Sequence, residues 1–169
     1  MSALDPLRTL GHGIRCTAMQ VQVVLSYAQL CVFDAELDQP YNDWDAAHME
    51  QGFSWRPGSV SFAAESADGP VLVDVTSGAS PPPISDAATA IRVPFKVPPS
   101  GRIEVGSVMS GVQVLIPSGH YALYFVAPER KGQPYLVAFV PSNDRQAEVV
   151  KESSVARKQQ TYKMTARAA

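Results

Sequence analysis

The chain has 169 residues, of which 46% are hydrophobic and 18% are charged, and its formal net charge at pH 7 is −2. This length and composition predict one domain with a substantial buried core, and the near-neutral balance gives no indication of nucleic-acid or membrane binding. The charge is uneven, however, because residues 1–144 carry 14 acids and 8 bases, whereas residues 145–169 carry 2 acids and 6 bases. The sequence therefore predicts an acidic body and a basic tail.

The two cysteines, Cys16 and Cys31, are too few for a disulfide-stabilised scaffold, so we expect both to be reduced. The N-terminal residues lack the basic flank and apolar run of a secretion signal, and no later apolar run approaches membrane-spanning length. We therefore expect a cytoplasmic protein that makes no membrane contact.

Short runs that alternate apolar and polar residues predict strands along most of the chain. The predicted strands lie at 21–33, 58–65, 70–77, 91–99, 102–108, 111–117, 120–129 and 134–141. Eight short strands joined by Pro-, Gly- and Ser-containing turns predict a mainly all-β fold, an antiparallel β-sandwich. Pro94 lacks the N–H of a ladder hydrogen bond, so its strand should lie at a sheet edge or carry a bulge there.

Three segments follow from this pattern. Residues 21–141 are the predicted β-sandwich domain, residues 1–20 are an N-terminal extension, and residues 142–169 are a basic C-terminal tail. Large apolar residues are few in the tail, so it offers little surface to offset the entropy of ordering. We expect it to be weakly ordered.

One short helix is predicted near residues 43–51. Asp43 is placed to cap its N-terminus, Asp45 complements the helix dipole, and Gly52 is placed as the residue that ends it. The helix could instead present metal ligands, since Asp43, Asp45, His48 and Glu50 are of suitable types. Only Asp45 and His48 share a helix face, however, so we favour the capped helix and expect no metal.

Catalytic residues are not indicated by any motif. His12, His48 and His120 are candidate bases and several serines are candidate nucleophiles, but there is no G-x-S-x-G elbow and neither cysteine has a catalytic context. We expect no enzymatic activity and no cofactor.

Carboxylates are concentrated between residues 34 and 50, and no Lys or Arg occurs from residue 16 to 55. Such a run can be an ordinary solvated face, or it can occupy a basic groove on a partner. Aromatic residues beside it could anchor an interface, although Trp44 and Phe53 could equally pin the helix to the sheet. The candidate partner-binding residues are Asp34, Glu36, Asp38, Asp43, Trp44, Asp45, Glu50 and Trp55.

Three stretches together resemble the competence protein J family, inhibitors of the DNA-entry nuclease. They are "VLSYAQLCVFD", "DWDAAHMEQGFSWRPGSVSFAA" and "AIRVPFKVPPSGRIEVGSVMSGVQVLIPSGHYALYFVAPE", and the resemblance spans roughly residues 23–140. Its most specific parts are the D-W segment that leads into Gly52-Phe53, the V-P-F-x-V strand and the I-P-x-G-x-Y turn.

The resemblance implies a non-catalytic protein that binds a DNA nuclease and suppresses DNA cleavage, without binding nucleic acid itself. The acidic run supplies a physical route, because a nuclease holds polyanionic DNA in a positive groove. Two other readings remain open: a β-sandwich module that binds a small molecule or carbohydrate through Trp44, Trp55 or Tyr121, and an enzyme whose site is assembled from distant residues.

Overall fold

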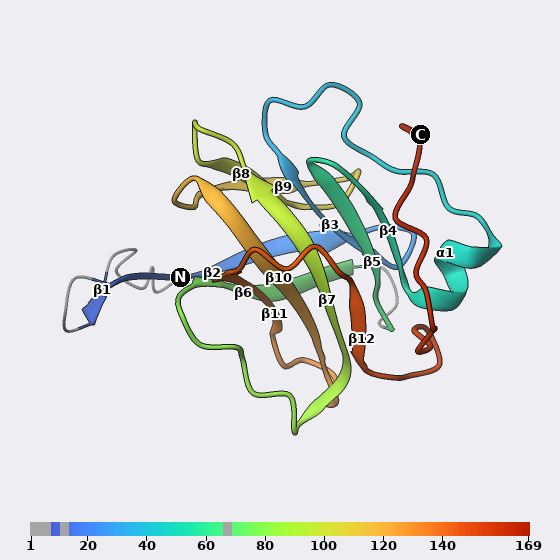
Figure 1. Cartoon of the computed structure of the whole chain (residues 1–169). Helices are drawn as coiled ribbons and strands as arrows, with labels where there is room; N and C mark the ends of the chain where they lie inside the picture. The colour runs from blue at the N-terminus through green and yellow to red at the C-terminus, as the bar shows by residue number, and fades with distance from the viewer. Residues whose placement is uncertain (1–7, 11–13, 66–68) are drawn as a thin grey trace.

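The computed structural model describes residues 8–10, 14–65 and 69–169, and it describes side chains from residue 18 onward within those ranges. These residues form a two-sheet sandwich with one short helix, α1 (Ala46–Gln51), at its side (Figure 1). The β-sandwich predicted from the sequence is thus confirmed. No helix in the described ranges has the length and apolar character needed to cross a membrane.

The two sheets differ in size and draw their strands from different parts of the chain. In spatial order, the first sheet contains β1 (Arg8–Leu10), β2 (Ile14–Leu25), β6 (Gly69–Ser77), β11 (Tyr135–Pro141), β10 (Gly119–Pro128), β7 (Ala87–Val97) and β12 (Glu148–Lys151). The second sheet contains β4 (Phe53–Arg56), β5 (Ser59–Ala63), β3 (Gln29–Asp34), β8 (Arg102–Gly106) and β9 (Gly111–Leu115). Among the described strands, all pairings are antiparallel except that between β6 and β11.

The core lies between the two sheets because alternate residues of each strand face inward. In β7, Ile91, Val93 and Phe95 are buried while Arg92 and Lys96 point outward, as the period-two pattern predicts. The two layers meet at Phe62 of β5 and Phe125 of β10, whose rings stack with centroids 4.6 Å apart.

The predicted strand at 21–33 is in fact two strands that belong to different sheets. Ser26 and Gln29 form a bridge around a tight turn in which Tyr27 and Ala28 have φ of 54° and 50°. That left-handed turn is usually marked by Asn or Gly, and neither is present, so no break is visible in the sequence. β2 also begins at Ile14, inside the predicted extension, whereas residues 1–7 and 11–13 lie outside the described residues.

Pro94 lies where β7 has an open edge, as predicted. β12 pairs with β7 only at residues 90–92, so no described strand neighbours the edge beyond Arg92. β12 itself was missed by sequence reasoning, and so was β4, because four residues are too few to show a period.

The basic tail, for which the sequence predicts weak order, makes specific contacts with the rest of the protein. After β12, residues 152–169, which we call the C-terminal strap, run back along α1 toward the 35–42 loop (Figure 1). Ala156 is fully buried, and Tyr162 packs on Phe53 with ring centroids 5.8 Å apart. Main-chain and side-chain hydrogen bonds to residues 41–51 hold the rest, and these do not depend on the large apolar residues that the tail lacks.

Candidate partner-binding surface

Helix α1 is capped by Asp45, two residues later than the predicted cap at Asp43. The Asp45 carboxylate accepts a hydrogen bond from the His48 backbone N–H at 3.1 Å, and His48 Nδ1 accepts one from the Asp45 N–H at 3.1 Å. The two residues therefore form a reciprocal capping box, with histidine in the role usually taken by Glu or Gln. Gly52 ends the helix with φ of 83°, as predicted.

His48 is a structural residue and not an exposed ligand or base. Its side chain is 1% exposed, and its Nε2 lies 2.8 Å from the Thr165 carbonyl oxygen of the strap. Because Nδ1 accepts from a backbone N–H, the ring proton is on Nε2 and is donated to Thr165. Within the described part of the chain, no three His, Cys, Asp or Glu residues gather as a metal-binding group.

Two of the candidate carboxylates are bound by the strap. Asp45 forms an ion pair with Lys163, which with the His48 backbone hydrogen bond lowers the Asp45 pKa from 3.8 to about 2. Asp43 accepts a hydrogen bond from the Arg167 backbone N–H at 2.8 Å. Sequence reasoning could not find these contacts, since the partners lie far along the chain and carry no motif.

The strap also binds the helix at its buried face. The Gln51 amide donates hydrogen bonds to the Phe53 and Lys163 carbonyls, each at 2.9 Å, and its oxygen accepts from the Lys163 N–H at 2.8 Å. Arg157 donates its backbone N–H to the Glu50 carbonyl at 2.9 Å. The segment around α1 is therefore fixed on one side by the strap.

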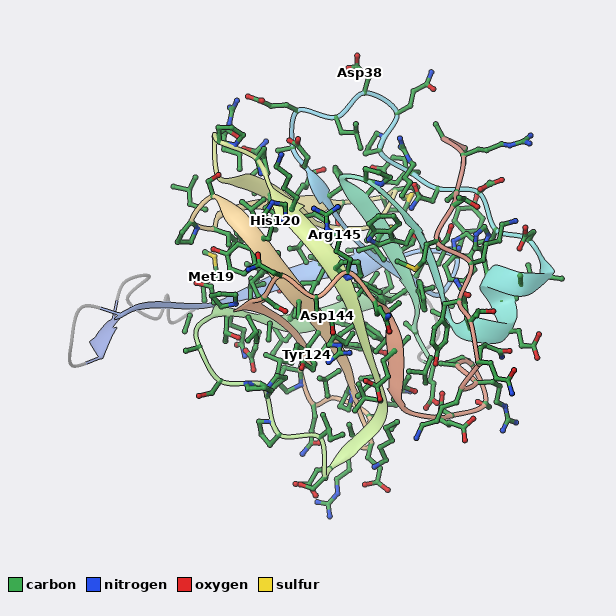
Figure 2. All side chains as sticks on the ribbon, viewed as in Figure 1. Met19, Asp38, His120, Tyr124, Asp144 and Arg145 are labelled. Carbon is green, nitrogen blue, oxygen red and sulfur yellow. The ribbon has the colours of Figure 1, made fainter. Side chains whose placement is uncertain are left out.

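The other four candidate carboxylates, at the end of β3, on the 35–42 loop and on α1, form no hydrogen bond or ion pair with the strap within the described residues. Asp34 accepts from the Glu36 backbone N–H at 2.9 Å, and Glu36 forms an exposed ion pair with Arg102. Asp38 lies at the outer tip of the loop and is exposed (Figure 2), and its carboxylate has no hydrogen bond or ion pair within the described ranges. Glu50, on α1, is likewise exposed, and its carboxylate has no such contact there either.

The base of this loop is well anchored. The Asn42 amide is buried and donates to the Ser54 and Ser59 carbonyls at 2.9 and 3.2 Å. Arg56 Nε donates to the Asn42 side-chain oxygen at 2.7 Å, and the same guanidinium binds the Gln39 carbonyl. These bonds hold the Asp38 loop in a defined shape.

The two tryptophans are both half-buried, so neither is a free aromatic platform. Trp44 contacts the His48 ring edge-on at 6.3 Å, and its indole nitrogen is buried without a hydrogen-bond partner among the described residues. Trp55 donates its indole N–H to the Pro94 carbonyl at 2.7 Å. Phe53 is fully buried against Tyr162 and therefore pins the helix region to the core.

A cleft of about 690 Å³ lies beside the loop and includes two of the candidate residues, Asp34 and Trp55. Its other lining residues come mainly from β7, the start of β10 and the segment after β11, and sequence reasoning singled out few of them. Tyr121, a candidate platform for a small molecule, lines the same cleft but is only 6% exposed, and its hydroxyl donates to the Pro117 carbonyl.

Cys31 is a buried core residue with a free thiol. Burial is the main cause that raises its pKa to about 12, against a smaller opposing hydrogen bond with Ser61. A thiol held in its neutral form is a poor nucleophile, so Cys31 contributes packing. The side chain of Cys16 lies outside the described residues.

The architecture is that of a mainly antiparallel β-sandwich protein, and solved structures share it. The crystal structure of ComJ from Bacillus subtilis, described as an inhibitor of the DNA-degrading activity of NucA, matches with a TM-score of 0.66 and 22% identity, covering 76% of this chain and 98% of that one. A structure described as crocagin biosynthetic gene J matches with a TM-score of 0.52 and 16% identity, covering 76% of this chain and 99% of that one.

The family follows from the sequence. Residues 22–150 match the Competence protein J (ComJ) family model, so this chain belongs to the ComJ family. The match extends slightly beyond the 23–140 segment that carries the resemblance, and the C-terminal strap lies after its last residue. A comparison with curated protein sequences gave no match.

Proposed function

We propose that this protein binds a DNA nuclease and suppresses DNA cleavage without catalysing a reaction itself. Family membership carries this proposal: ComJ of B. subtilis, which shares the fold, is described as an inhibitor of the DNA-degrading activity of NucA. We further propose that binding takes place in the cytoplasm, where the sequence leads us to expect the protein.

The acidic surface is the docking element in this proposal. A nuclease needs a positive groove to hold DNA, and carboxylates on a rigid loop compete for that groove. Asp38 and Glu50 support this role because both are exposed without a partner in the described chain, and Asp34 and Glu36 precede Asp38 at the start of the anchored loop. Asp43 and Asp45 are assigned a smaller part, since the strap already binds them.

DNA cleavage by a NucA-like nuclease from the organism that encodes this protein, measured with and without the purified protein, is the direct test. We expect cleavage to fall stoichiometrically as the inhibitor is added and the inhibitor alone to leave DNA intact. A gel-shift measurement should detect no complex of the inhibitor with DNA, because the proposed inhibition acts on the nuclease and not on its substrate. Undiminished cleavage at saturating inhibitor would contradict the proposal.

A small-molecule function is the second candidate, favoured only by the cleft that contains both Trp55 and Tyr121. The indole N–H of Trp55 and the hydroxyl of Tyr121 both donate to backbone carbonyls. A ligand could therefore contact only the partly covered faces of the two rings. Native mass spectrometry of the purified protein would reveal a retained ligand.

A further inference from the structure

The cleft beside the acidic loop has an apolar floor and a wall formed by a strand edge. Apolar residues of its lining come from the loop, β4, β7, the segment after β7 and the start of β10, and they include Leu37, Trp55, Pro94, Phe95, Pro98 and Tyr121. In Figure 2 the labelled His120 and Arg145 lie close to each other over β7 and β10, and both residues line the cleft. The labelled Asp38 lies well away from them, at the loop tip.

The wall at β7 exposes backbone hydrogen-bonding groups. Backbone groups of a strand point alternately to its two sides, and those of Arg92 face β12 while the Pro94 carbonyl faces Trp55. The N–H and carbonyl of Lys96 therefore face the same open side, where no described strand pairs with them. The opposite residue, His120, directs its carbonyl to Ser142 on the far side, which agrees with this register.

The cleft also carries two cations that the fold leaves without a carboxylate partner. Lys96 and Arg145 are exposed, and neither forms an ion pair or side-chain hydrogen bond within residues 18–65 and 69–169. The neighbouring Asp144 does not neutralise them, because its carboxylate pairs with Arg92 at 3.4 Å and accepts from the Gln146 N–H at 2.9 Å. Asp34, toward the loop, is the remaining acid of the lining.

We propose that this cleft receives an extended segment of the partner nuclease that carries an acidic side chain. The carboxylate is bound by Lys96 and Arg145, the segment's backbone bonds to the free N–H and carbonyl of Lys96, and its apolar atoms lie on Trp55 and Pro98. This deepens the proposed function and rests on it. The interface then has two regions of opposite charge: an acidic loop that enters the nuclease groove, and a basic cleft beside that loop.

The prolines explain why the contact is short. Pro94 has no N–H and its carbonyl is taken by Trp55, and Pro98 follows directly after the strand, so Lys96 alone offers a full pair of backbone bonds. A continuous added strand is thus excluded, and specificity must come from the two cations and the apolar floor. A short partner segment that carries one acidic side chain beside apolar atoms fits both the two cations and the apolar floor.

Charge reversal separates this contact from a general electrostatic effect. The test variant is Lys96→Glu with Arg145→Glu, and the matched control is Arg130→Glu with Lys131→Glu, exposed cations at the other end of β10. Both variants change the net charge of the inhibitor by the same amount, because each reverses two cations. A nuclease that responded only to net charge would bind both at least as tightly as wild type.

We expect the cleft variant to bind the nuclease roughly tenfold or more weakly, and the control to bind within about twofold of wild type or more tightly. Thermal melting verifies that both are folded, and Lys96→Gln with Arg145→Gln replaces the test variant if it is not. Carbodiimide cross-linking should join Lys96 to an Asp or Glu of the nuclease.

Equal binding by the cleft and control variants, or cross-links that never involve Lys96, would overturn the proposal while leaving nuclease inhibition intact. A small molecule retained in the cleft of the active inhibitor would also overturn it. Failure of the wild type to bind the nuclease would instead contradict the proposed function itself, and the cleft proposal would fail with it.

Discussion

The carboxylates of residues 34–50 divide into two regions that look alike in sequence and differ in structure. Around α1, Asp43 and Asp45 are bound by the strap, and Asp45 also caps the helix. On the 35–42 loop, Asp38 is exposed at the tip with no partner in the described chain, while the loop base is pinned by Asn42 and Arg56. Charge density alone therefore does not mark a docking surface, because some of the charged groups stabilise the fold.

Deleting residues 152–169 should produce the largest effect, since the α1 region depends on the strap. Loss of the Ala156 and Tyr162 packing removes about 3 kcal/mol of unfolding free energy, which lowers Tm by roughly 6–12 °C for a domain of this size. Thermal melting measures this directly. Added peptide 152–169 should restore part of the loss, and an unchanged Tm after deletion would show that the strap does not stabilise α1.

Gly52→Ala tests the contact between the end of α1 and the strap by adding a single Cβ atom. A Cβ at Gly52 would lie 2.5 Å from the Ala156 Cβ, and φ of 83° disfavours a side chain, so we expect a cost of about 2–3 kcal/mol. Gly132→Ala is the control, because Gly132 has φ of 90° but open space around it, and its cost should be about 1–2 kcal/mol. Denaturant unfolding measures the free energy of unfolding of the two variants. Equal losses would show that the close contact of residue 52 with Ala156 adds nothing to the cost.

Asp45→Asn should change how stability depends on pH. The folded pKa of about 2 lies below the ordinary 3.8, so the charged form stabilises the fold above pH 3.8 and that contribution is lost as pH falls through about 2. Wild type should therefore lose more Tm between pH 5 and pH 2 than Asp45→Asn, whose amide still caps the helix. Asp86→Asn, at an exposed site, should follow wild type; parallel curves for all three would refute the Asp45 ion pair.

Sequence reasoning reached the fold because its signals are local. Alternation in β7 and β10, Pro94 at an open edge and Gly52 at the helix end each depend on a few neighbouring residues. It failed where the signal is distant or absent: the turn at Tyr27 and Ala28 has no Gly or Asn, and the partners of two carboxylates near α1 lie on the strap. The cleft was missed for the same reason, since its lining comes from separate segments.

The candidate site was predicted in part. The acidic run and Trp55 were located from composition, and the structure places Asp34 and Trp55 on one cleft. Composition could not tell which carboxylates already form ion pairs, because that depends on cations such as Arg102 and Lys163 far along the chain. The assignment of all eight residues to an interface therefore stays a prediction.

The association rate of the inhibitor with its nuclease at low and moderate salt tests the central claim most directly. The test variant, Asp38→Asn with Glu50→Gln, removes two exposed carboxylates that have no partner in the described chain. The control variant, Asp86→Asn with Glu129→Gln, removes two exposed carboxylates at the other end of the sandwich. We predict that the test variant associates roughly three- to tenfold more slowly than the control at low salt, and that moderate salt narrows the difference because it screens exposed charges. Equal rates for the two variants at both salt concentrations would contradict the account and exclude these two carboxylates from docking.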